Sequence, residues 1–128
     1  MKKNLLPLLL FSVFISCAKK ETPAVEKTYT VQYKIEMTAV ANTVLTGTVT
    51  YVSKSSIAAT TNLATPGWTF TESNWALKSG DRIGFSTTIS NLAAYKAFLI
   101  IDGGVKTYNA ESSTAPLNGK IDLHYVMP

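Results

Sequence analysis

Residues 29–39, with the sequence YTVQYKIEMTA, decide the fold class of this chain. Apolar side chains occupy every second position of this segment, and polar ones stand between them. The apolar positions are Tyr29, Val31, Tyr33, Ile35, Met37 and Ala39. A period of two is typical of a β-strand that buries one face. The segment therefore predicts a half-buried strand with these six side chains pointing inward.

Similar segments recur along the rest of the chain. Alternating or apolar runs follow at residues 45–51, 68–71, 83–89, 95–101, 105–110 and 121–127, with a weaker one at 56–61. Turn signals separate them, among them Asp102-Gly103-Gly104, where the glycines supply the positive φ of a tight hairpin turn. No stretch shows a sustained 3.6-residue period. The sequence predicts an all-β fold, a single immunoglobulin-like β-sandwich of seven or eight antiparallel strands.

The N-terminal segment indicates export. Lys2 and Lys3 precede an apolar run over residues 5–15, and Ser16 stands before Cys17, the only cysteine of the chain. A basic start, a short apolar run and a small residue are typical of a secretory signal peptide. The run is shorter than the roughly 20 residues needed to span a membrane. Because cysteine stands at the cleavage point, the segment resembles a bacterial lipoprotein signal, which implies that Cys17 carries the lipid.

The chain then divides into three parts. Residues 1–16 are expected to form the lipoprotein signal peptide, residues 17–27 a flexible tether, and residues 28–128 the β-sandwich domain. Ala18 replaces the aspartate that retains lipoproteins at the inner membrane of some bacteria. We therefore expect a lipid-anchored protein of the outer membrane of a Gram-negative bacterium. Its domain could face either the periplasm or the outside of the cell.

The charge distribution argues against nucleic acid as a partner. The formal net charge of +4 arises mostly in the signal and the tether, whereas the domain from residue 28 onward holds seven Lys and Arg against six Asp and Glu. A nucleic-acid-binding domain needs a basic patch on one face. With no second cysteine, the exported domain also lacks a disulfide and a thiolate metal site.

The order of several short stretches resembles the soluble domain of the MmpS family, whose members are small membrane-anchored β-sandwich partners of MmpL exporters. The matching stretches are Val31-Gln32-Tyr33, Thr48-Val49-Thr50-Tyr51, Pro66-Gly67-Trp68, Lys78-Ser79-Gly80-Asp81 and Ile100-Ile101-Asp102-Gly103-Gly104-Val105. The resemblance implies a β-sandwich with an accessory role in an envelope or transport complex. The family's cysteine pair in the domain has no counterpart here.

Catalytic signals are weak. His124 is the only histidine, and strand alternation places it on the outward face with Asp122, which favours a solvated side chain over a general base. Asp81 and Asp102 border glycine turns, where Asp commonly bonds to nearby backbone. The domain has six carboxylates, and their spacing offers no pair for hydrolysis unless the fold brings two together. We expect a protein that is not an enzyme and needs no cofactor or metal, with a carboxylate-dependent hydrolase as the less favoured alternative.

Two tryptophans remain as candidates for binding. Trp68 shares its strand parity with Phe70 and is expected in the core, whereas Trp75 follows a polar turn at residues 73–74 and is expected to be partly exposed. An exposed tryptophan can stack on a sugar ring or anchor a partner protein. The expected function is thus a non-catalytic binding or accessory module for an envelope protein, with a glycan-binding or adhesin-like module as the alternative.

Overall fold

Six antiparallel strands make up the part of the chain that the computed structural model describes, residues 26–55 and 59–128. They are β1 (Thr28–Ala39), β2 (Thr46–Tyr51), β3 (Ala59–Asn62), β4 (Gly67–Ala76), β5 (Arg82–Ile101) and β6 (Gly104–Val126). In these described ranges, no helix is long and apolar enough to cross a membrane. The expected signal peptide, the expected lipidation site Cys17 and most of the expected tether lie outside them.

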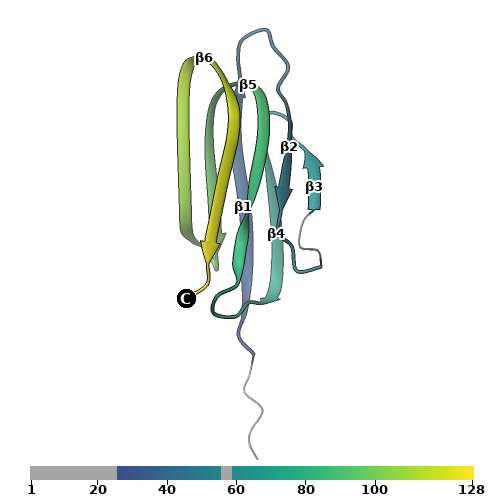
Figure 1. The fold of residues 1–128 in the computed structure, drawn as a ribbon, viewed down its shortest axis with the longest axis vertical. Coiled ribbons are helices and arrows are strands. Elements are labelled where there is room, and N and C mark those ends of the chain that lie inside the picture. The colour runs from purple at the N-terminus through teal and green to yellow at the C-terminus, as the bar shows by residue number, and fades with distance from the viewer. Residues whose placement is uncertain (1–25, 56–58) are drawn as a thin grey trace, which may run out of the picture.

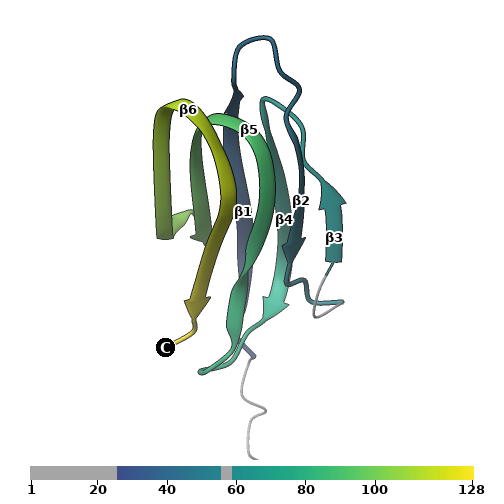
Figure 2. The same cartoon turned by 45° about the horizontal axis from the view of Figure 1, so that its top comes forward.

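All six strands belong to one hydrogen-bonded sheet, in the order β3-β2-β5-β1-β4 with β6 beside β5. β5 pairs with β2 along its first half and with β1 along its second half, and β6 follows it throughout. Between the halves, at Asn91, φ is 63° and the β5–β6 register shifts. Both long strands arch there, and this folds the sheet over on itself (Figures 1 and 2).

The arch produces two limbs that face each other. The β1 limb contains β4, β1, the second half of β5 and the first half of β6, and the β2 limb contains β3, β2 and the remaining halves. The all-β antiparallel class is confirmed. The runs at 83–89 and 95–101, expected as separate strands, are one strand, and so are those at 105–110 and 121–127. The pairing of the described strands makes one curled sheet, not two separate ones.

The core lies between the limbs. On β1, Val31, Tyr33, Ile35 and Met37 are buried, which confirms the inward row predicted from the alternation. The ring of Tyr33 lies at the centre, with its centroid 5.6 Å from that of Phe70 and 5.6 Å from that of Phe85. Rings from both limbs therefore meet around Tyr33 and supply much of the apolar contact area that a disulfide-free domain needs.

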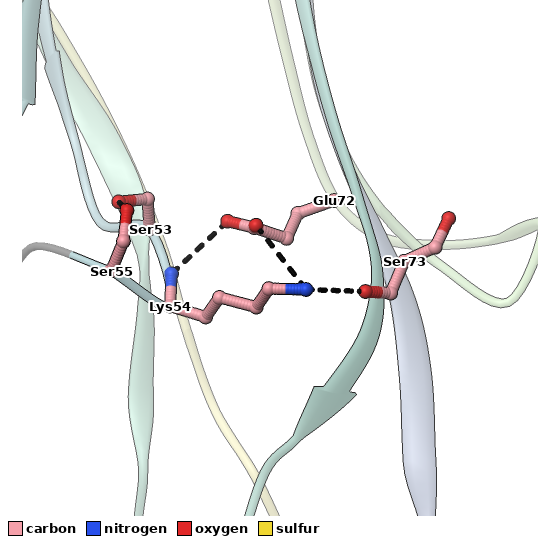
Figure 3. A network of polar contacts seen from close by, with 5 residues as sticks. All are labelled: Ser53, Lys54, Ser55, Glu72 and Ser73. Atoms are coloured by element: carbon pink, nitrogen blue, oxygen red, sulfur yellow. Dashed lines mark hydrogen bonds and ion pairs between the residues drawn. The ribbon is translucent and has the colours of Figure 1, made fainter.

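Side chains close the gap between β2 and β4, which do not pair with each other. Beyond the end of β2, the Lys54 backbone N–H donates to the Glu72 carboxylate at 3.1 Å, and the Lys54 ammonium donates to the Ser73 carbonyl at 2.9 Å. The ammonium also lies 3.6 Å from the other Glu72 oxygen (Figure 3). These contacts, which we call the Lys54–Glu72 clasp, hold the chain after β2 against β4, where no backbone hydrogen bonds join β2 and β4.

Candidate functional site

Trp75 is buried, with 8% of its surface exposed, so the expectation that it is partly exposed was wrong. The reason is a β-bulge. Tyr29 pairs with Trp75 and Val31 pairs with Glu72, so β4 holds one more residue than β1 in this interval. Asn74 takes a φ of 56° at the bulge, and the alternation changes parity there. Trp75 therefore turns inward and joins the core.

Trp68 lies inside as well, but at the margin of the core. It is partly buried and packs against the rings of Tyr51 and Phe85, at centroid distances of 5.1 and 6.1 Å. Its inward orientation agrees with the shared parity with Phe70, to which it is stacked. Both tryptophans thus serve packing between the limbs, and a binding role for either stays a prediction without an exposed ring to support it.

The titratable groups are dispersed. The His124 Nδ1 atom contacts the Asp122 carboxylate on the outward face of β6, as the parity of His124 predicted. The Asp81 carboxylate accepts a hydrogen bond from the Lys78 backbone N–H at 2.8 Å, which confirms its turn role, and Asp102 accepts one from Thr30 at 2.8 Å. Among the described residues, no group of His, Cys, Asp and Glu could hold a metal ion.

The two outer faces of the sheet differ in character. The outer face of the β2 limb is hydroxyl-rich, with the Thr50 and Thr60 side chains 3.2 Å apart across β2 and β3. On the outer face of the β1 limb, the register aligns Lys34, Phe98 and Tyr108 across three strands. The Phe98 and Tyr108 ring centroids are 5.0 Å apart, and Tyr108 is 53% exposed. Among the residues that the structure describes, an aromatic pair with an exposed ring thus lies on only one of these two faces.

A groove of about 590 Å³ adjoins this aromatic pair on the β1 limb. Two rows of paired residues cross it, and Pro66 forms one wall. The rows are Glu36, Lys96 and Ala110, followed by Thr38, Ala94 and Ser112; Met37, Tyr95 and Glu111, on the row between them, also line the groove. Because most side chains of the two rows are short, the outer surface of the sheet is recessed here. The larger side chains of Phe98 and Tyr108 project from the neighbouring row. We call the groove and this aromatic pair the groove face.

Charges on the groove face are locally balanced. The Lys34 ammonium lies 2.6 Å from a Glu36 carboxylate oxygen and 5.8 Å from the centre of the Phe98 ring. The hydrogen bond from Lys34 and its charge, with a smaller contribution from Lys96, lower the pKa of Glu36. The carboxylate is therefore ionised at neutral pH and can accept hydrogen bonds, while Lys96 supplies donors on the same row.

Sequence reasoning did not find this face. The run at residues 95–101 lies in the second half of β5, between β1 and β6, and carries apolar side chains on both of its sides. The outward apolar residue Phe98 was the available signal. It became informative only once the register placed Tyr108 opposite it.

Comparison with known proteins leaves the chain without a family: no family model matches it, and no curated protein is significantly similar to it. The resemblance to the MmpS family consequently remains a prediction.

Proposed function

We propose that this protein is a non-catalytic, lipid-anchored envelope protein, and that it acts as a binding or accessory module through the groove face. The observation that carries the proposal is the exposed Tyr108 ring, packed against the half-buried Phe98 ring, beside a groove on the outer face of the β1 limb. Exposed aromatic residues next to a polar rim are typical of interaction sites. In the proposed location, the outer membrane, such a face would be available to other envelope components.

The position of the groove fits an anchored protein. β1 begins at the end of the molecule where the C terminus also lies (Figure 1). The groove begins at Glu36, eight residues along the strand, or roughly 26 Å at about 3.3 Å per residue. A lipid on Cys17 would attach through the N-terminal end of β1. The groove would then lie at the part of the domain away from the attachment.

An accessory role beside a transporter, as the MmpS resemblance implies, is one form of this function. The hydrolase alternative gains no support from the geometry. The structure gives Glu36, Glu72, Asp122 and Glu111 different partners, namely Lys34, Lys54, His124 and Tyr95. Paired carboxylates across a cleft are what hydrolysis of a glycosidic bond needs.

Site-specific photocrosslinking tests the proposal. A photoreactive phenylalanine analogue replaces Tyr108 on the groove face in cells that produce the full chain, and the same analogue replaces Thr48 on the β2 limb as the control. We expect an adduct of higher mass from position 108 only. Equal adducts from both positions, or none from position 108, would contradict a binding role for the groove face.

A further inference from the structure

We infer that the ligand of the groove face is a glycan, bound with one sugar ring in the groove and the next ring on Tyr108. This inference rests on the proposed function and adds the class of ligand. It follows from the size and lining of the groove, from the aromatic pair beside it, and from the small net charge of the face.

The groove matches a ligand that is apolar on its faces and polar on its edges. Its volume of about 590 Å³ lies within the range of roughly 300–1,000 Å³ found for sites of small ligands. Ala94 and Ala110 give it apolar surface, while Glu36 offers an acceptor and Lys96 a donor on one row. A pyranose ring carries C–H groups on its faces and hydroxyls on its rim, and each hydroxyl both donates and accepts.

The aromatic pair extends the site in one direction. Tyr108 and Ala110 lie two residues apart on β6 and point to the same side, roughly 6–7 Å from each other along the strand. A sugar linked to the one in the groove would therefore reach the Tyr108 ring. The Phe98 ring packs against the Tyr108 ring at a centroid distance of 5.0 Å, while more than half of the Tyr108 surface stays exposed. The arrangement favours a chain of sugars over a single one.

Other classes of ligand fit less well. The large apolar residues exposed on this side of the β1 limb are Tyr108 and, near the end of the hairpin, Val105, which is a small apolar centre for a protein interface. Lys34 and Lys96 are offset by Glu36, which contacts Lys34, and by Glu111, which also lines the groove. The face therefore has little net positive charge to offer a polyanion or an acidic peptide. Sugar hydroxyls, in contrast, need paired donors and acceptors and no net charge.

The test is isothermal titration calorimetry of the full chain in detergent micelles. The titrants are oligosaccharides built from hexose, N-acetylhexosamine or uronate units, and polyglutamate as an acidic peptide. Tyr108→Ala removes the exposed ring, with Val126→Ala as the control at a similarly exposed apolar position. Ala110→Gln fills the groove, with Thr88→Gln as the control on the β2 limb. We expect saturable binding of at least one oligosaccharide, weakened at least tenfold by each groove-face variant and unchanged by the controls.

Three results would overturn the inference. The first is that no oligosaccharide of the panel binds saturably. The second is that an oligosaccharide binds but both groove-face variants bind it as well as the native chain does. The third is that polyglutamate binds and the same variants abolish its binding. If position 108 still crosslinks to a protein while no oligosaccharide binds, the binding function stands and the glycan is wrong. If neither crosslinking nor oligosaccharide binding occurs, both proposals fail.

Discussion

Replacing Tyr33 by Phe tests how the centre of the core is built. The Tyr33 side chain is fully buried, and its hydroxyl donates a hydrogen bond to the Val52 carbonyl oxygen at 3.0 Å. Phenylalanine keeps the ring and its contacts with Phe70 and Phe85 but removes this bond. A hydrogen bond of this kind contributes about 1 kcal/mol net to the free energy of unfolding. At pH 8 the variant should therefore be less stable by about that amount.

The difference should change with pH. Burial raises the pKa of Tyr33 above the usual tyrosine range, and the nearby charge of Glu72 raises it further. In the unfolded chain a tyrosine ionises near pH 10, so above that pH the unfolded state loses a proton that the folded state keeps. The contribution of this raised pKa to the free energy of unfolding is fully present below pH 10. As the pH rises above 10, this contribution is lost at about 1.4 kcal/mol per pH unit.

These two effects predict a crossing. At about pH 11 the native chain has lost roughly 1.4 kcal/mol through Tyr33, which exceeds the roughly 1 kcal/mol that the hydroxyl contributes at pH 8. Tyr33→Phe should equal the native chain in stability shortly below pH 11 and exceed it above. Urea unfolding followed by circular dichroism from pH 8 to pH 11.5 measures this, with Tyr108→Phe as the control at an exposed tyrosine. A difference between the two proteins that stays constant over this range would refute the reasoning.

Four further predictions concern packing, the clasp and the anchor. Trp75→Ala should lower the free energy of unfolding by about 3–5 kcal/mol, because the ring is buried in the core, and a loss below 1 kcal/mol in urea unfolding would contradict its inward position. Gly84→Ala should fail to give a folded domain by circular dichroism, because its Cβ would lie 2.1 Å from a carbonyl oxygen of β6. Glu72→Gln should lower the free energy of unfolding by no more than about 1.5 kcal/mol, since Lys54 is half exposed and water screens the ion pair, and high salt should shrink the difference. Cys17→Ser should shift the full chain out of the detergent phase in a phase-separation assay, and unchanged partitioning would rule out the lipid anchor.

Local sequence patterns were sufficient to predict the regular strand segments and the inward row of β1. Val31, Tyr33 and Ile35 are buried as the alternation indicated, because side chains of a strand point to opposite faces in turn. The turn after β5 could also be predicted, since Asp102 and Gly103 take φ values of 49° and 79°, which Asn, Asp and Gly adopt most readily. These features depend on residues that are neighbours in the sequence.

The candidate site could be predicted only in part. An apolar outward position at Phe98 was visible in the sequence, but its partner Tyr108 lies on another strand and enters the face through the β5–β6 register. The groove likewise needs small residues from different strands in adjacent rows, together with Pro66 from the loop before β4. No periodicity within one strand contains that information.

The sequence by itself therefore determined the all-β class, the inward side of each regular strand and the tight turn between β5 and β6. The tertiary structure alone decided that β5 continues through Asn91 as one arched strand, and that the bulge at Asn74 turns Trp75 into the core. The physical reason is the same in both places. A single residue with positive φ can either end a strand or bend it, and which of these occurs depends on the strands that pair on either side of it.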